Sequence, residues 1–501
     1  MSHHAFLVVI PVADRPRHIQ ACLGSLREVL RRFPYAGRIR VLLADDSSEA
    51  ASIAANRALA HGFSSDGLEV IHFPPAEQLA LLHSHGIALP RVLGDMPRER
   101  RGPYGHKGQG VMRNIAYLKA AEMLRGESDT LIWSIDSDQE FRVDVPENDG
   151  YVLDYFNALD AIFARTDVEV LTGKVVGDPP VSPAVMTRNF LADVLSFLTE
   201  MAQRDPAAAC SHHTGATAPA DAAYHDMADL FGFQPALHYA YPCPLDGKHT
   251  EADCLADFDR RVNSFFYGEH PTRSTHYQPS DPLASLQPAR TVYAGNYVFR
   301  PSALKFFIPF APLRLRMSGP TLGRILKVEL ESRFVSANLP MLHRRTVERG
   351  GQAEFRPGIE TAETTIDMSG EFERQFYGDV MLFTIERLLG QDRGCRLVSA
   401  DFAPTLDTLR DEILARYNER QQAVLDRLAR LDALLVDPAH WWHGEVTGFR
   451  QFAANVRRNF SAGSSGHARI NDDSRWQAWR LRLLDALAHY AEDRAAWLRL
   501  L

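Results

Sequence analysis

Two acidic side chains, Asp136 and Asp138, follow a short apolar run in the segment TLIWSIDSDQEF, residues 130–141. An apolar run of this length is typical of a buried strand. The two acids then stand where the strand leaves its sheet, and ligands of open α/β sheets bind beyond the carboxyl ends of the strands. Carboxylates spaced i and i+2 at such a place are suited to hold a divalent cation against a phosphate. An acidic turn after a strand uses the same residue types, so these residues alone leave both interpretations open.

Apolar periodicity places these acids in a sheet flanked by helices. Strands expected at 5–10, 40–44 and 68–73 alternate with helices expected at 18–33 and 49–61. This alternation is typical of a parallel sheet with helices on its faces. The elements expected next are a basic, glycine-rich loop at 98–110, helices at 111–124, 151–165, 186–201 and 319–334, and extended segments at 168–172, 290–299 and 335–343.

From about residue 370 the chain has helical spacing to its end. A stripe of apolar residues marks one face of a long amphipathic helix, and a second stripe follows a polar connector at 461–473. The first stripe consists of Leu406, Leu409, Ile413, Tyr417, Val424, Leu428, Leu431 and Leu435. Such stripes pack either against the rest of the chain or across a subunit interface, so a homodimer through the C-terminal helices remains an open expectation.

The composition is that of a folded protein with more than one domain. The 501 residues favour two or three domains, and the formal net charge of −8 argues against a nucleic-acid partner. No stretch approaches the roughly 18 apolar residues of a transmembrane helix, and no signal peptide is recognisable. The five cysteines are few, odd in number and widely spread, which favours a reducing compartment. We therefore expect a cytoplasmic protein without a transmembrane segment.

The ordered set of motifs resembles the GT-A glycosyltransferases, especially the large family-two-like group. The motifs are VVIPVADRP (8–16), VLLADDSS (41–48), KGQGVMRNIAYLKAA (107–121), IWSIDSDQEF (132–141), YAGNYVFRPSAL (293–304) and NLPMLHRRT (338–346). The resemblance covers roughly residues 5 to 345. It implies an α/β fold of the GT-A type, a Rossmann-like mixed sheet flanked by helices, here with a large insertion and an α-helical C-terminal region.

The resemblance also implies a domain organisation and an activity. Residues 1–204 would form the half that binds the nucleotide sugar, 205–290 an insertion near the acceptor, 291–369 the acceptor side, and 370–501 a helical domain. The enzyme would be a hexosyltransferase that moves a sugar from a nucleoside diphosphate, a UDP or GDP sugar, to a hydroxyl group of a small molecule or glycan. It would use Mn²⁺ or Mg²⁺ bound at the D-x-D motif.

Residues near the first two strand ends correspond to the part of the family that meets the nucleoside. The resemblance implies that Pro11 and Val12, with nearby Asp14 and Arg15, border the nucleobase. Asp46 corresponds to the acid that contacts the base or the ribose. A plain turn or a helix cap would equally well use an acid after the second strand.

A second group corresponds to the diphosphate and metal site. The resemblance implies that Arg113 and Asn114 lie beside the donor, that Asp138 is a direct metal ligand, and that Asp136 contacts the ribose or a metal-bound water. His343 corresponds to a histidine that completes the metal site in many members. Arg113 as a solvated helix residue and His343 as an ordinary core or surface histidine are the alternatives.

The chemistry of glycosyl transfer also favours a cation site, independently of the resemblance. A departing nucleoside diphosphate gains negative charge, which a divalent cation stabilises, and a histidine ligand favours Mn²⁺ over Mg²⁺. Lys107 and Arg113, with backbone amides at a helix start, are suited to phosphate oxygens, although Lys107 in a loop could contribute general basicity alone. Asn296, in the motif YAGNYVF, is a further candidate substrate-binding residue.

The segment 313–325, LRLRMSGPTLGRI, departs from the family because the acidic pair that includes the base of inverting members is missing. An inverting displacement needs a base for the acceptor hydroxyl, for which Glu329, Asp246 and Asp253 are candidates. A retaining reaction that uses the leaving phosphate as base needs none, and we favour it slightly. Arg314 and Arg316 could bind a carboxylate or phosphate, or form a basic surface strand.

The insertion is dense in histidine and cysteine. Its spacings fit no standard zinc pattern, so the sequence disfavours a structural zinc, and some of the histidines could line the acceptor pocket instead. These residues are Cys210, His212, His213, His225, His238, Cys243, His249, Cys254, His270 and His276.

Two other classes of function compete with glycosyl transfer. A sugar nucleotidyltransferase also uses a βαβ sheet with acids and Mg²⁺, but it usually has a glycine-rich loop after its first strand, where this chain reads IPVADRP. A non-catalytic protein that binds sugar nucleotides would keep the same pocket without turnover.

Overall fold

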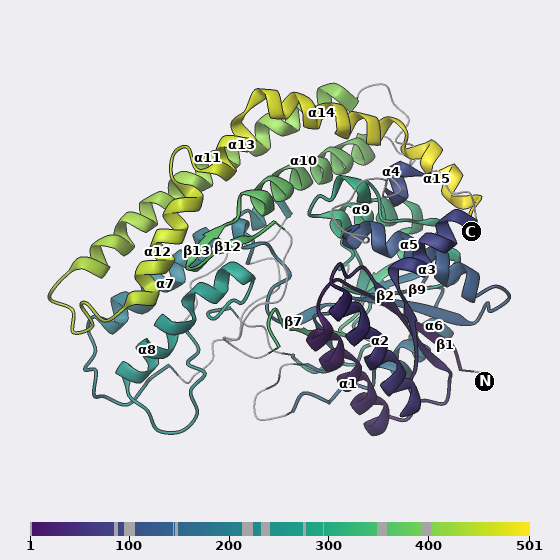
Figure 1. Cartoon of the computed structure of the whole chain (residues 1–501), viewed down its shortest axis with the longest axis horizontal. Coiled ribbons are helices and arrows are strands. Elements are labelled where there is room, and N and C mark those ends of the chain that lie inside the picture. The colour runs from purple at the N-terminus through teal and green to yellow at the C-terminus, as the bar shows by residue number, and fades with distance from the viewer. Residues whose placement is uncertain are drawn as a thin grey trace.

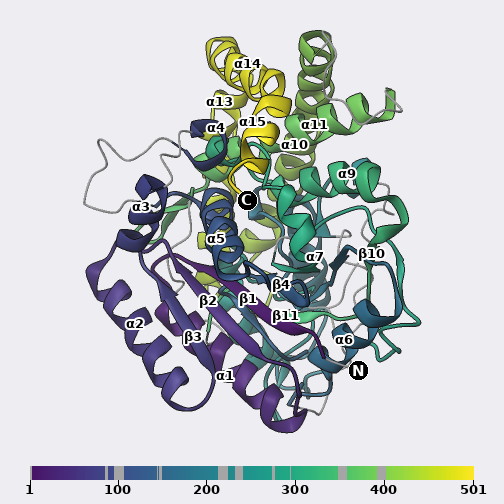
Figure 2. The same cartoon turned by 90° about the vertical axis from the view of Figure 1, so that its right-hand side faces the viewer.

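The computed structural model describes residues 3–84, 89–94, 106–143, 145, 149–212, 224–231, 241–273, 277–293, 295–347, 358–391 and 402–501. A mixed sheet with its flanking helices forms one lobe, and long helices from the C-terminal region form an arm that leads away from it (Figure 1). In the second view the sheet is seen with helices on both of its faces (Figure 2).

The central sheet has eight strands in the order β3-β2-β1-β4-β9-β6-β10-β8. The strands are β1 (Ala5–Val12), β2 (Ile39–Asp45), β3 (Glu69–Phe73), β4 (Thr130–Ile135), β6 (Val170–Thr172), β8 (Gln287–Pro288), β9 (Asn296–Phe299) and β10 (Phe334–Ser336). Strands β3, β2, β1 and β4 run parallel, whereas β9 lies antiparallel between β4 and β6. This mixed sheet confirms the expected α/β class, and it puts the end of β4 in the middle of the molecule.

A small second sheet extends the end of β4. It consists of β5 (Gln139–Glu140), β11 (Met341–His343) and β7 (Val175–Gly177), in the order β5-β11-β7. In its register, His343 faces Gln139 across an antiparallel pair and Gly177 across a parallel pair. The pairing therefore joins the segment after the two acids to the segment that contains His343.

The two faces of β1 bury different helices because side chains alternate along a strand. Phe6, Val8 and Ile10 belong to a core shared with α1 (Pro16–Arg32) and α6 (Tyr155–Arg165). Leu7 and Val9 belong to a core shared with α5 (Gln109–Met123). The remaining helices of this lobe are α2 (Ala50–Ser65), α3 (Pro75–Ser84) and α4 (Pro90–Leu93).

The described residues from Ser369 onward are mainly helical, as expected. Their helices are α10 (Ser369–Gln391), α11 (Phe402–Val436), α12 (Thr447–Phe460), α13 (Ser465–Asn471), α14 (Asp473–Ala488) and α15 (Tyr490–Leu498). Three further helices precede them: α7 (Thr187–Met201), α8 (Glu251–Arg261) and α9 (Ser318–Leu330). All eight residues of the first predicted stripe are buried on α11, which packs against α7, α10 and α12 of the same chain. Packing within the chain therefore accounts for the stripe.

One part of the helical region differs from the expectation. The segment 461–473, expected as a polar connector, contains the helix α13, in which His467 and Ile470 are buried. A Cβ atom at Gly466 would lie 3.2 Å from the Phe372 ring, so the glycine allows a close contact between α13 and α10. A packing contact of this kind overrides the polar local composition.

The chain end returns to the sheet lobe. Trp497 of α15 donates from its indole Nε1 to the carbonyl of Leu304 at 2.7 Å, and Arg91 of α4 pairs with Asp493 of α15 at 2.9 Å. The last helix of the chain, α15, therefore fastens the helical arm to the sheet lobe (Figure 2).

The described part of the insertion 205–290 packs into the arm. Its helix α8 and the 3-10 helix η4 (Val262–Tyr267) contact α12, and Phe258 and Phe265 form an aromatic cluster with Phe190 of α7 and Phe452 of α12. The expected role of the insertion beside an acceptor, and the bounds of the four expected domains, stay predictions. His213, His238 and His276 lie outside the described residues.

Among the described residues, no helix has both the length and the apolar character that crossing a membrane requires.

Asp379 of α10 is buried between helices of the arm, and this predicts a pH dependence of stability. Its carboxylate accepts from Tyr417 at 2.7 Å and from Gln375 at 2.9 Å. Burial raises its pKa to about 7, although both hydrogen bonds oppose the change. Because the folded protein binds this proton more tightly than the unfolded chain, stability should fall by up to a few kcal/mol as pH rises from about 4 to 7.

The variant Asp379→Asn is neutral at every pH and keeps both partners, since the tyrosine hydroxyl can donate or accept. We expect thermal melting to show a higher Tm than the wild type at pH 8 and a flatter dependence of Tm on pH between 5 and 8. Asp411→Asn, at a side chain that is 72% exposed on α11, is the matched control and should leave the profile unchanged. An unaltered profile for Asp379→Asn would refute the assignment.

Candidate functional site

The second acid of the D-x-D motif is a buried carboxylate shared by three basic side chains. Asp138 Oδ2 lies 3.1 Å from Arg15 and 3.3 Å from Arg345. Its Oδ1 lies 3.6 Å from His343 Nε2. Burial alone would raise the pKa of Asp138, but His343, Arg345 and Arg15 together hold that pKa well below its usual range. The carboxylate is therefore ionised at neutral pH.

His343 is oriented for binding a metal ion. Its Nδ1 lies 2.6 Å from the carbonyl oxygen of Asp178, which can only accept, so Nδ1 carries the proton and Nε2 presents a lone pair in the neutral ring. The 3.6 Å between His343 Nε2 and Asp138 Oδ1 is too long for a hydrogen bond. Two atoms that each lie about 2.1 Å from one ion are separated by roughly 3 to 3.5 Å. The donor set thus fits Mn²⁺ or Mg²⁺ with one carboxylate and one imidazole ligand.

Asp136, the first acid, is more accessible and is oriented by residues of α5. It accepts hydrogen bonds from Arg113 and Gln109, and its carboxylate remains partly exposed. A Cβ atom at Gly295 would lie 2.8 Å from Asp136 Oδ2, so the glycine keeps this carboxylate clear. The exposed part of Asp136 can meet a ribose or a metal-bound water, as the sequence predicts.

Asp46 fixes the loop before α5. Its carboxylate accepts from the backbone amides of Lys107 at 2.8 Å and Gly108 at 3.0 Å, and it lies 3.2 Å from Lys107 Nζ. The Asp46 amide donates to the carbonyl of Val12 at 2.7 Å, which ties the end of β1 to the same loop. Both Asp46 and Lys107 are buried, so their first function in this structure is to hold the loop.

The turn after β1 has a strained backbone. Asp14 has a φ of +51°, and its carboxylate accepts from the amides of Ser48 and Glu49 and lies 2.6 Å from His106 Nε2. Non-glycine residues in this conformation cluster at functional sites. Pro11 and Val12 are buried at the end of β1 just before this turn. The predicted nucleobase border is thus one connected group.

Two of the predicted substrate-binding amides are occupied within the protein. Asn114 donates to the carbonyls of Val92 and Ile308 and accepts from the amide of Ile308. Asn296 accepts from the indole of Trp133 and donates to the carbonyls of Lys174 and Leu339. Both side chains are buried, so they position elements around the site and their predicted contact with substrate is not supported by this geometry.

Arg314 and Arg316 lie on a strained segment that faces α10. Arg314 has a φ of +55° and donates to the carbonyl of His106 at 2.9 Å. Arg316 Nε lies 3.4 Å from Glu371 of α10, and Glu371 also lies 3.4 Å from Arg374. Burial lowers the pKa of Arg374, and the positive charges of Arg316 and Arg314 lower it further, while Glu371 opposes them. Three arginines, Arg314, Arg316 and Arg374, therefore lie close together beside Glu371.

The candidate bases are engaged away from these contacts. Glu329 binds Arg494 of α15 with both carboxylate oxygens, one of them at 2.9 Å. Asp253 forms a capping box with Thr250 at the start of α8, and Asp246 is exposed in the preceding loop. The expectation that Glu329 is the catalytic base receives no support from its position, because Arg494 neutralises it.

The site also contains residues that the sequence did not single out. Arg345 is partly buried against Asp138, and its backbone amide donates to the Asp178 carboxylate at 2.9 Å. Gln109 of α5 and Arg374 of α10 are the other two residues of this kind. Arg345 alone had a local signal in the sequence, because it follows His343 by two residues in the motif NLPMLHRRT. Gln109 and Arg374 are recognisable only once the positions of α5 and α10 are known.

We compared the chain with known proteins. No protein-family model matches it, and no curated protein matches it. Among solved structures it is similar to a mannosyltransferase, PcManGT from Pyrobaculum calidifontis in complex with GDP-Man and Mn²⁺, at 9% identity over 98% of this chain and 87% of that chain, with a TM-score of 0.36. The similarity extends to glucosyl-3-phosphoglycerate synthase from Mycobacterium tuberculosis in complex with Mn²⁺, UDP and glucosyl-3-phosphoglycerate, at 10% identity over 68% and 73% of the two chains, TM-score 0.28.

A third solved structure, TarS of S. aureus, is similar at 11% identity over 86% of this chain and 54% of that chain, with a TM-score of 0.29. These likenesses concern the fold, and the chemistry of this chain rests on its own residues.

The contacts of Asp46 predict how the loop before α5 responds to its loss. Hydrogen bonds to a charged group each contribute about 1.5–3 kcal/mol, so Asp46→Ala should ease local opening and speed tryptic cleavage after Lys107 roughly tenfold or more. Timed digestion with mass spectrometry of the fragments measures this. Asp66→Ala removes an exposed carboxylate that pairs with Arg27 and should leave cleavage at Lys107 unchanged; equal rates for both variants would contradict the role of Asp46.

Proposed function

We propose that this chain is a metal-dependent glycosyltransferase that transfers a hexosyl group from a nucleoside diphosphate sugar to a hydroxyl acceptor. The observation that carries the proposal is the group formed by Asp138, His343, Arg15 and Arg345 at the carboxyl ends of β1, β4 and β11. The 3.6 Å between the Asp138 carboxylate and the His343 imidazole is close to the spacing of two ligands of one ion, and two guanidinium groups contact the same carboxylate. A diphosphate is the ligand that such a set attracts.

Asp138 and His343 would hold Mn²⁺ or Mg²⁺, and the bound ion would stabilise the charge on the departing diphosphate. The electrostatics of Arg345 support this role: burial lowers its pKa, Arg316 and Arg15 lower it further, and the carboxylates of Asp138 and Asp178 oppose them. A phosphate oxygen in contact with Arg345 would stabilise its positive charge beside the neighbouring arginines. Arg15 and Arg345 would orient the diphosphate, and Asp136 would meet the ribose.

The retaining course is the one we propose for the reaction. In that course a phosphate oxygen of the leaving group takes the proton of the acceptor hydroxyl, so the protein needs no carboxylate base. Glu329 is neutralised by Arg494, and Asp253 is used as a helix cap. Asp136 is held by Arg113 and Gln109. The positions of these acids support a mechanism without a protein base.

The acceptor we propose carries a carboxylate or a phosphate. Arg316 and Arg374 each lie 3.4 Å from the carboxylate of Glu371, and Arg314 adds a third positive charge next to them. Paired guanidinium groups bind planar or tetrahedral anions with two hydrogen bonds at once. An anionic group of the acceptor held here would bring its hydroxyl to the sugar.

A panel of sugar nucleotides tests the donor. We expect one of UDP-, GDP- and dTDP-sugars to raise the Tm of the wild type, and the shift to grow with Mn²⁺, because binding to the folded state stabilises it by mass action. Thermal shift with and without EDTA measures both effects. No shift with any of the three nucleotides at millimolar concentration would count against the proposal.

Two variants separate an enzyme from a binding protein. Asp138→Asn should lower the release of nucleoside diphosphate roughly 100-fold or more, and His343→Ala should weaken Mn²⁺ binding about 10- to 100-fold, as measured by the loss of the free-Mn²⁺ signal in electron paramagnetic resonance. Asp149→Asn, an exposed carboxylate paired with Arg32, is the control for both assays. A wild type that binds the donor and releases nothing with any acceptor would be a binding protein.

A further inference from the structure

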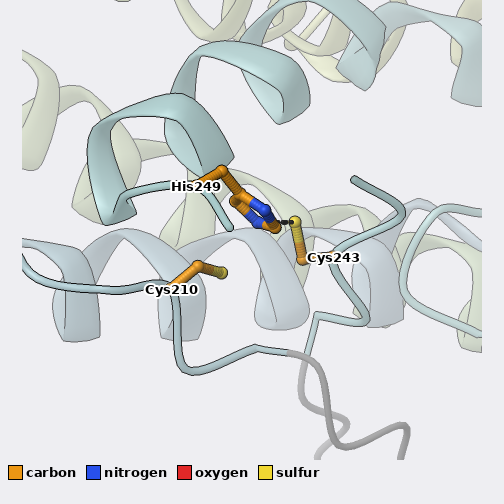
Figure 3. Close-up of side chains that lie close together, drawn as sticks. All are labelled: Cys210, Cys243 and His249. Atoms are coloured by element: carbon orange, nitrogen blue, oxygen red, sulfur yellow. Dashed lines mark hydrogen bonds between the residues drawn. The ribbon is translucent and has the colours of Figure 1, made fainter. Parts of the chain in front are cut away.

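Three cysteines and a histidine of the insertion come together at the start of α8. Cys210 follows α7, Cys243 lies in the segment before α8, His249 immediately precedes that helix, and Cys254 lies in its first turns. Figure 3 shows Cys210, Cys243 and His249 turned toward one another from three separate stretches of chain. No reaction step proposed above uses them.

The distances suit one metal ion. The ligand atoms of Cys210, Cys243 and His249 all lie within 4.8 Å of one another, and those of Cys210, Glu251 and Cys254 do so as well. Cys243 Sγ lies 3.2 Å from His249 Nε2. Zinc with bonds of about 2.3 Å to sulfur and 2.0 Å to nitrogen separates tetrahedral ligands by roughly 3.5 to 3.8 Å. Small movements of the side chains would close this set on one ion.

The backbone fixes the ligands independently of the metal. Ala209 forms a bridge with Thr250, and the Cys210 amide donates to the His249 carbonyl at 3.0 Å. The Cys243 amide donates to the carbonyl of His212 at 2.9 Å. These bonds join the loop after α7 to both segments before α8, so the four side chains are held together by paired backbone.

The surroundings match those of a zinc ligand set. His249 Nδ1 lies 3.0 Å from the carbonyl of Gly247, which directs Nε2 toward Cys243. Cys254 is fully buried in the first turn of α8, next to Cys243 and Cys210. Glu251 is turned to other partners, since its Oε1 accepts from Ser211 at 2.9 Å and from Arg204 at 3.1 Å.

We propose that Cys210, Cys243, Cys254 and His249 form a structural zinc site with three thiolates and one imidazole. Such a set is closed, with four protein ligands and no open position, so its role is to stabilise the fold. The zinc would fasten α8 to the loop after α7, and through α8 the aromatic cluster that joins the insertion to α12. The ion at Asp138 is a separate site with oxygen and nitrogen ligands, and neither depends on the other.

A disulfide is the competing use of these thiols. One disulfide would consume two of the three and leave an odd thiol beside a histidine whose Nε2 already points at sulfur. Zinc coordination would instead use all three thiols together with the imidazole, as a tetrahedral Cys₃His set. Intact-mass analysis distinguishes the two, because a disulfide removes two hydrogens.

Metal analysis of the full, untagged chain tests the proposal. We expect about one zinc ion per chain in the wild type by inductively coupled plasma mass spectrometry, and roughly tenfold less or lower in Cys243→Ser. Cys22→Ser, at a buried cysteine in α1, is the matched control and should keep its zinc. Asp138→Asn should also keep its zinc, which separates this site from the one proposed for the donor.

Cobalt provides a second measurement that does not depend on the folding of a variant. Wild-type protein stripped of metal and reloaded with Co²⁺ should show the intense visible bands of tetrahedral cobalt and a thiolate charge-transfer band. Reduced wild-type protein that takes up neither Zn²⁺ nor Co²⁺, or peptides in which Cys210 is disulfide-linked to Cys243 in freshly prepared protein, would overturn the proposal. Equal zinc content in Cys243→Ser and the wild type would overturn it as well.

Discussion

The site is organised by a buried negative charge that must be balanced. Asp138 lies inside the protein, where an unpaired carboxylate would cost several kcal/mol, and the groups that balance it come from distant parts of the sequence. Arg15 follows β1, and His343 and Arg345 lie at and just after the end of β11. The ion pairs that stabilise the carboxylate therefore also join the segment after β1 to the segment at the end of β11, which are far apart in the sequence.

The helical arm contacts the sheet lobe through ion pairs. Helix α10 contributes Glu371 and Arg374 next to Arg316, and α15 brings Arg494 to Glu329. The arm in turn depends on the aromatic cluster between α7, α8, η4 and α12, which the proposed zinc site would reinforce from the insertion. Apolar packing thus stabilises the arm itself, while ion pairs determine how the arm contacts the sheet lobe.

Several residues illustrate why a site is harder to predict than a fold. The acids after β4 and the histidine of β11 were recognisable, because strand ends and motif order are local signals. Asn114 and Asn296 lie in the expected motifs, yet their amides are consumed by backbone groups of neighbouring segments. The residue types in a motif indicate which chemistry its side chains could perform. Only the contacts in the folded chain show whether a side chain can still bind a ligand.

The sequence by itself determined the strands β1 to β4, their alternation with α1 and α2, the position of Asp136 and Asp138 after a buried strand, and the apolar face of α11. These follow from periodicity over a few turns or residues, which one segment contains in full. The tertiary structure alone decided that Arg345 shares Asp138, that Glu329 is neutralised by Arg494, and that four ligands with no standard spacing meet at α8. These depend on contacts between segments far apart in the sequence, whose free energy is gained only when the chain folds and which therefore leave no pattern in any single segment.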